Sequence, residues 1–201
     1  MEIEETQRVA RRGILAAGFG GAAISLLPFL TGRASAATET SAPKRPTPDD
    51  VSLLAVAQQL ELTATELYSQ AISDVKGWTD EQAAVMVAMR EAHLAFANSL
   101  SAMLGKAAPG TPIEELLTSL GSSFAGDATN VIKAAADLES AAVATHTEVL
   151  GKLVGLDGAA LVASIQIAEA RHTTVLRSLA GSSDLADLLV DTEAASLLGN
   201  A

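Results

Sequence analysis

The sequence predicts an all-α protein with four long helices in two antiparallel hairpins, joined by a long crossover between the second and third helices. Ala and Leu are the commonest of the 201 residues and aromatic residues make up only 3%, which favours helix over sheet. Apolar residues recur with the 3.6-residue period of an amphipathic helix. A helical pattern also repeats after 78 to 79 residues, so that Leu60-Glu61 corresponds to Leu138-Glu139 and His93 to His172. These three observations indicate a duplicated helical hairpin.

The first hairpin is expected to comprise helices over residues 48–73 and 79–104. Thr47 or Asp49 can cap the first helix, and two aspartates suit the positive end of its dipole. The short loop 76–78 joins it to a second helix that Thr79 opens. A turn this short places the two helices antiparallel and side by side.

The second hairpin is expected to comprise helices over residues 127–154 and 159–180, joined by the tight turn 155–158. More than twenty residues link the two hairpins, beginning with the Pro- and Gly-rich stretch 105–112. A link of this length can cross the whole bundle. Two short helices are also expected, one within the link over 113–120 and one terminal apolar helix over 185–198 that covers the bundle.

The N-terminal residues 1–36 have the three parts of an export signal. Arg11-Arg12 precede an uncharged apolar run over 13–30, and Ala34-Ser35-Ala36 follows as an A-x-A cleavage site. The arginine pair resembles the twin-arginine signal of bacteria. The protein is therefore expected in the periplasm, in the cell envelope or outside the cell. The alternative is an uncleaved membrane anchor, because the apolar run is about as long as the shortest helices that span a membrane.

Residues 37–48, rich in Pro, Ser and Thr, are expected to form a disordered linker before the domain at 49–201. Cleavage after Ala36 removes four arginines and three glutamates, so nine basic and 21 acidic residues remain and the net charge is −12. This charge argues against nucleic acid and anionic lipid as partners, so the signal segment is the only expected membrane contact. The chain has no Cys and thus no thiolate metal ligand.

Five residues are predicted to be metal ligands. Bundles that bind two metal ions through bridging carboxylates take one inward Glu from two helices and a Glu-x-x-His from each of the other two. Each candidate lies near the middle of its predicted helix, so the side chains can meet at one level. The second Glu-x-x-His is incomplete, because Arg90 stands where its glutamate belongs. The predicted ligands are Glu61, His93, Glu139, Glu169 and His172.

These residues make the chain resemble the ferritin-like superfamily, and in particular small exported bacterial proteins with a ferritin-like domain. The resemblance covers residues 51–180. It implies a ferritin-like bundle that binds iron or manganese and performs oxygen, peroxide or iron-oxidation chemistry, although other members have lost the metal. Neither a phosphate-binding loop nor a nucleotide or flavin motif is present in the sequence. Tyr68 and His146, two turns beyond Glu61 and Glu139, are interpreted as core residues, with support of the metal ligands as the alternative.

Arg90 decides between two functional hypotheses. We expect its guanidinium to turn inward, pair with Glu61 or Glu169, and weaken or replace metal binding. If it instead extends into solvent, Glu139, Glu169 and His172 remain able to hold one ion. The first hypothesis is therefore an exported metal-binding oxidoreductase or iron-handling protein, and the second is a metal-free binding or scaffold protein of the cell envelope. The sequence leaves open the small-molecule partner and the oligomeric state, a homo-oligomer included.

Overall fold

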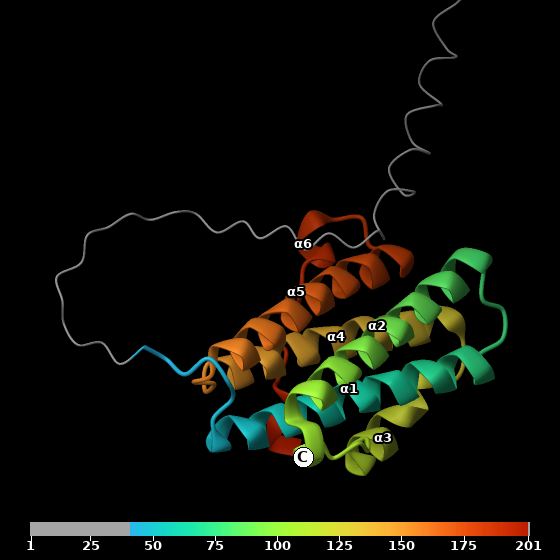
Figure 1. Cartoon of the computed structure of the whole chain (residues 1–201). Helices are drawn as coiled ribbons and strands as arrows, with labels where there is room; N and C mark the ends of the chain where they lie inside the picture. Colours follow the sequence, from blue (N-terminus) through green and yellow to red (C-terminus); the bar gives the residue numbers. More distant parts are fainter. Residues whose placement is uncertain (1–40, 201) are drawn as a thin grey trace, which may run out of the picture. The chain divides into compact units, whose positions relative to one another are not determined.

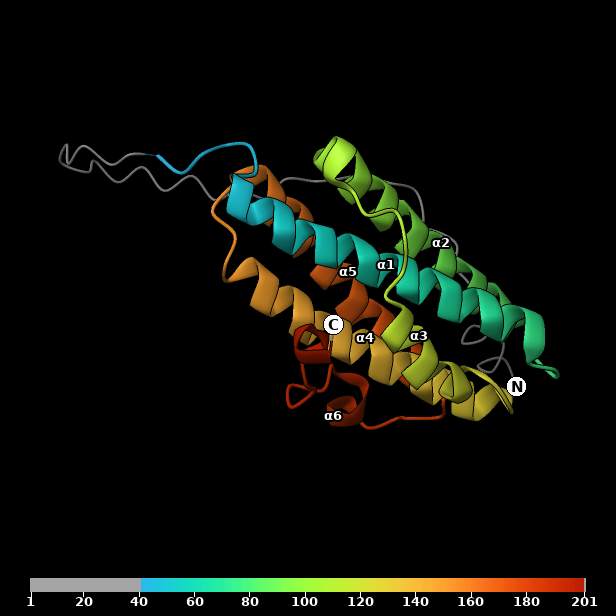
Figure 2. The ribbon, with the colours of Figure 1, turned by 90° about the horizontal axis from the view of Figure 1, so that it is seen from below.

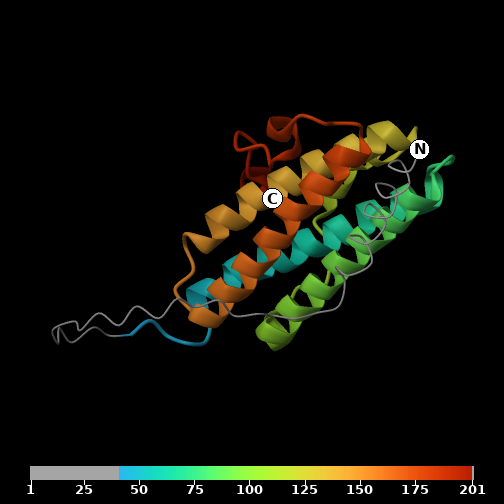
Figure 3. The same cartoon turned by 90° about the horizontal axis from the view of Figure 1, so that it is seen from above.

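Four long helices form the bundle in a computed structural model that describes residues 41–200 (Figure 1). The predicted signal over 1–36, and residues 37–40 of the predicted linker, lie outside the described residues. The first hairpin is α1 (Pro48–Asp74) and α2 (Asp80–Leu104), and the second is α4 (Ala128–Leu150) and α5 (Leu156–Leu179). Figure 3 shows each hairpin as a pair of neighbouring helices. The all-α prediction is confirmed.

The crossover contains three short helices and returns the chain along the bundle. It comprises η1 (Gly105–Ala107), α3 (Glu114–Leu120) and η2 (Gly121–Phe124), and Figure 2 shows α3 beside α1 and α4. A parallel β-bridge between Lys76 and Asp127 places the start of α4 next to the end of α1. Helix α4 therefore runs antiparallel to α1, and the link lies between the second and third long helices as predicted.

Side-chain caps start three of the four long helices. Thr47 and Asp50 form a reciprocal capping box at α1, and Thr79 and Gln82 form another at α2. Asp127 caps α4 by accepting a hydrogen bond from the Asn130 amide. Of the two caps expected for the first helix, the structure uses Thr47.

The fourth long helix is capped by the backbone of the predicted linker. The amides of Leu156 and Asp157 donate to the carbonyls of Pro43 and Lys44, each at 2.9 Å. Gly155 permits this approach, because a Cβ there would lie 2.7 Å from the Arg45 carbonyl oxygen. The prediction of disorder is therefore wrong for residues 43–46, which supply acceptors that the first turn of a helix needs.

Asp50 joins the start of α1 to the turn before α5. Its carboxylate accepts hydrogen bonds from the amides of Thr47, Val154 and Gly155 at 2.7, 2.8 and 2.9 Å. Burial raises the pKa of this carboxyl, but the three amide donors outweigh that effect and lower the pKa from 3.8 to about 2. Ionised Asp50 therefore stabilises the fold.

We expect Asp50→Asn to lower the free energy of unfolding by about 1–3 kcal/mol at neutral pH, because the amide nitrogen cannot accept these bonds. The stabilisation by Asp50 is fully present above its unfolded-state pKa and is lost as the pH falls from about 4 towards 2. Urea unfolding of both proteins between pH 7 and pH 2 measures this. A stability difference that stays constant over that range would contradict the role assigned to the ionised carboxylate.

The terminal segment does not form the predicted helix over 185–198. It contains only α6 (Leu185–Leu188) and η3 (Leu197–Asn200), joined by irregular chain. Leu185 and Leu189 are 80% and 62% exposed, so the segment lacks the buried apolar face that would stabilise a helix. Hydrogen bonds from the amides of Asp191 and Leu197 to Ser140 and Thr145 attach it to α4.

The described core has three apolar clusters, and a polar layer lies between the two largest of them. One cluster includes Leu67, Met86, Ile132 and Leu176, and the other includes Leu54, Leu100, Val149 and Ile165. On each long helix the candidate ligands lie between the residues of one cluster and those of the other. The two clusters thus seal the polar layer from both ends of the bundle. Among the described helices, none is long and apolar enough to cross a membrane.

Candidate metal centre

Six ionisable side chains form the polar layer, and all four long helices contribute to it. Five of the residues are at most 1% exposed, and the sixth, His172, has 15% of its side chain exposed. Buried ionisable groups are costly unless they pair with one another or bind metal. The six residues are Glu61 on α1, His93 on α2, Glu139 and His146 on α4, and Glu169 and His172 on α5.

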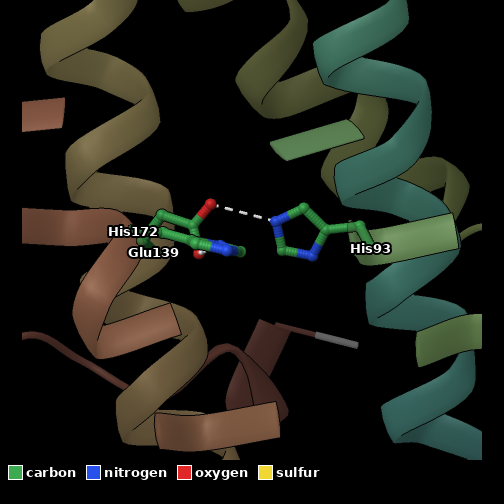
Figure 4. Close-up of side chains that lie close together, drawn as sticks. All are labelled: His93, Glu139 and His172. Carbon is green, nitrogen blue, oxygen red and sulfur yellow. Dashed lines mark hydrogen bonds and ion pairs between the residues drawn. The ribbon is translucent and has the colours of Figure 1, made fainter. Parts of the chain in front are cut away.

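Carboxylates and imidazoles alternate along the first half of this layer. His172 Nδ1 lies 3.3 Å from Glu139 Oε2, and Glu139 Oε1 lies 2.9 Å from His93 Nε2. The other ring nitrogen of His93, Nδ1, lies 2.7 Å from Glu61 Oε2. Figure 4 shows His93 facing Glu139 and His172 from across the bundle. His93 therefore connects the carboxylates of the two hairpins.

The alternation continues through His146. Its Nε2 lies 3.4 Å from Glu61 Oε1, without hydrogen-bond geometry, and its Nδ1 lies 2.9 Å from Glu169 Oε2. Within the described part of the chain, His146 Nε2 and Glu169 Oε1 are buried atoms with no hydrogen-bond partner. Two atoms of metal-ligating type are thus buried in the layer without a hydrogen bond. The contacts confirm that the five predicted residues converge, and they add His146.

The layer requires positive charge. Burial lowers the pKa of His93 and His146, but the neighbouring carboxylates raise the first well above 6.5 and the second to about 9. Burial raises the pKa of Glu139, yet the His93 charge reverses this and holds it well below its usual value. Burial also raises the pKa of Glu169 to about 7, with His146 opposing and Glu61 reinforcing the shift. Protonated imidazoles, or metal cations in their place, therefore balance the buried carboxylates.

The six residues separate into two trios, each able to hold one metal ion. The two-histidine trio is His93, Glu139 and His172, and the two-glutamate trio is Glu61, His146 and Glu169. In each trio, one ligand atom per residue lies within 4.8 Å of the other two. Imidazole nitrogens and carboxylate oxygens suit iron and manganese, so the donors fit the metals that the sequence implied. The alternative single-ion grouping of Glu139, Glu169 and His172 corresponds to neither trio, because these residues divide between the two.

Arg90 does not turn inward. Its guanidinium pairs with Glu91 and keeps 31% of its side chain exposed. A long arginine side chain can extend from an inward-facing start to water, which avoids burying a fixed charge. The prediction that Arg90 pairs with Glu61 or Glu169 is therefore wrong, and those carboxylates contact histidines instead.

We expect Arg90→Ala to change the free energy of unfolding by less than about 1 kcal/mol, because a half-exposed ion pair contributes little. Thermal unfolding of the wild type and the variant measures this, with Lys152→Ala as a matched control that breaks another surface ion pair, with Glu148. A loss of several kcal/mol in Arg90→Ala alone would show that the guanidinium supports the polar layer after all.

His146 belongs to the polar layer, whereas Arg90 does not. The place of His146 in the sequence predicted a core residue, and the structure does bury it, but between two carboxylates. Its spacing of seven residues from Glu139 puts both side chains on one face of α4. That spacing could have placed His146 in the layer, although a core histidine and a ligand histidine look the same in sequence.

Tyr68 occupies the position in the first hairpin that corresponds to His146 in the second. Its hydroxyl donates to Glu139 Oε1 at 2.6 Å, and its ring stacks on His93 with a centroid distance of 5.4 Å. Burial and the Glu139 charge raise the pKa of Tyr68 well above 10, so the hydroxyl stays a donor. Tyr68 therefore orients two members of the two-histidine trio.

A small cavity of about 10 Å³ borders the layer, which is about the space that one water molecule requires. Glu61, His93 and Glu169 line it together with apolar residues. Leu116 of α3 and Leu197 of η3 also line it and belong to the crossover and the terminal segment. The site thus accommodates only very small molecules in the conformation described.

The family model for the ferritin-like domain matches residues 49–182, which span all four long helices and all six residues of the layer. No curated protein and no solved structure matches the chain. The family match covers two-thirds of the sequence and agrees with the hairpin repeat, the crossover and the His/Glu layer. The chain therefore belongs to the ferritin-like domain family.

Proposed function

We propose that this ferritin-like protein binds two transition-metal ions, iron or manganese, one in each trio. The observation that carries the proposal is the sorting of the six layer residues into two ligand groups, one of which has two buried atoms without a hydrogen-bond partner among the described residues. Bound ions of this kind supply redox chemistry, which makes an oxidoreductase or iron-handling role the proposed activity.

The residues of the chain bind, orient and exclude water in this proposal. Glu61, His146 and Glu169 hold one ion, and His93, Glu139 and His172 hold the other. Tyr68 fixes the Glu139 carboxylate by donating to it, and the stacked ring restrains His93. The two largest apolar clusters keep bulk water from the layer, which strengthens each charge interaction inside it.

Metal binding to untagged protein tests the proposal. Iron(II), added without oxygen, and manganese(II) are expected to raise the unfolding temperature and to remain bound after desalting. Glu139→Gln should lose this effect, whereas Glu148→Gln, an exposed residue on the same helix, should keep it. A wild-type protein without retained metal or thermal shift would contradict the proposal and favour the metal-free scaffold hypothesis, in which the alternating ion pairs complete the layer.

We also propose that the protein is exported and that residues 1–36 are removed. The arginine pair, the apolar run and the A-x-A triplet of the sequence support this. The mass of the exported protein should correspond to a start at Ala37, and replacing both Arg11 and Arg12 by Lys should block export. A full-length chain in the membrane fraction would indicate an anchor. Export of the Lys variant would indicate a general secretory route.

A further inference from the structure

We propose that the two trios are not equivalent: the two-histidine trio binds its ion first and prefers zinc, cobalt or iron(II), whereas the two-glutamate trio binds second and accepts manganese(II). This inference rests on the proposed function and adds an order of filling and a metal preference to it. The hairpin repeat alone would give two equivalent sets of ligands. In this chain Arg90 stands on α2 in place of a carboxylate, and His146 contributes an imidazole from α4, so the two trios differ.

The donor atoms predict the difference in metal preference. The two-histidine trio offers two nitrogens and one carboxylate, and the two-glutamate trio offers one nitrogen and two carboxylates. Imidazole suits zinc, iron and copper, whereas carboxylate suits manganese, and manganese stands lowest in the general affinity order of these divalent ions. The two-histidine trio therefore discriminates more strongly against manganese.

The supporting contacts predict the order of filling. Glu139 accepts from the Tyr68 hydroxyl, and His93 has one nitrogen held by Glu61 while its ring stacks on Tyr68. Such contacts hold ligands in place before the metal arrives and strengthen binding. In the two-glutamate trio, by contrast, Glu169 Oε1 and His146 Nε2 have no hydrogen-bond partner among residues 41–200, and Nε2 has only the 3.4 Å contact with Glu61. That trio must order more of its own ligands when it binds an ion.

Solvent access favours the same order. His172 of the two-histidine trio is the only one of the six layer residues with more than 1% exposure. All three members of the two-glutamate trio are enclosed, and Glu61 and Glu169 face the water-sized cavity. An ion from solvent therefore reaches the two-histidine trio with less movement of the protein.

Cobalt(II) titration of metal-free, untagged protein tests the inference through visible absorption and calorimetry. We expect two binding steps whose affinities differ by at least about tenfold, the lower end of what orienting contacts contribute. His172→Ala should remove the tight step and keep the weak one, and Glu169→Ala should do the reverse. Circular dichroism of each variant confirms that it is folded.

A second experiment needs no variant. Protein given one equivalent of zinc and then manganese(II) should show one bound manganese by electron paramagnetic resonance, and excess manganese should not displace the zinc. Two steps of equal affinity, or loss of the weak step in His172→Ala, would overturn the inference while leaving the proposed function intact. The absence of any stoichiometric metal binding would overturn both.

Discussion

Glu139→Ala is expected to lower the free energy of unfolding of the metal-free protein by about 3–5 kcal/mol, because it leaves buried positive charge without its partner. The Glu139 carboxylate is fully buried and contacts His93, His172 and the Tyr68 hydroxyl. Its removal leaves each of these groups with one polar contact fewer in a site closed to water. Urea unfolding at neutral pH measures the loss.

Glu148→Ala is the matched control for this prediction. Glu148 lies on the same helix, but its side chain is 40% exposed and pairs with Lys152 at the surface. Its replacement should change the free energy of unfolding by no more than about 1 kcal/mol. Equal effects of the two substitutions would show that helix α4 responds to any lost glutamate and that Glu139 has no special place in the layer.

Tyr68→Ala is expected to destabilise the protein by about 3–5 kcal/mol, the usual cost of removing a large buried ring. Tyr68 is completely buried, stacks on His93 and packs edge-on against Phe124 at a centroid distance of 6.0 Å. The loss combines a cavity in the apolar cluster with a missing hydrogen bond to Glu139. Thermal and urea unfolding report the combined effect.

Tyr68→Phe separates the two contributions, because it keeps the ring and removes only the hydroxyl. The stability loss should fall to about 1.5–3 kcal/mol, the value for a hydrogen bond to a charged group. Metal affinity in the two-histidine trio should fall about 10- to 100-fold, as is usual when a group that orients a ligand is lost. Unchanged metal affinity in Tyr68→Phe would exclude an orienting role for the hydroxyl.

The bundle could be predicted because local and long-range patterns agree. Thr47 and Thr79 mark helix starts, and the short turns and the long link define the topology. The convergence of Glu61, His93 and Glu139 followed from their central places in helices of similar length. Such features depend on helical geometry, which sequence spacing determines directly.

The remaining features depend on tertiary contacts. The direction of Arg90 depends on Glu91 and on the path of a flexible side chain to water, and the helical period does not specify either. The place of His146 in the polar layer depends on two carboxylates from other helices. Residues 43–46 are held in place by backbone amides at the start of α5 that have no partner within that helix. These amides lie far away in the sequence.

Anomalous X-ray scattering from crystals of metal-loaded protein tests the central claim most directly. After loading with iron(II) or manganese(II), we predict about two peaks per chain at the absorption edge of the metal, the number for a two-metal bundle. One peak should lie among His93, Glu139 and His172, and the other among Glu61, His146 and Glu169. The absence of any peak in the polar layer of loaded protein would contradict the account.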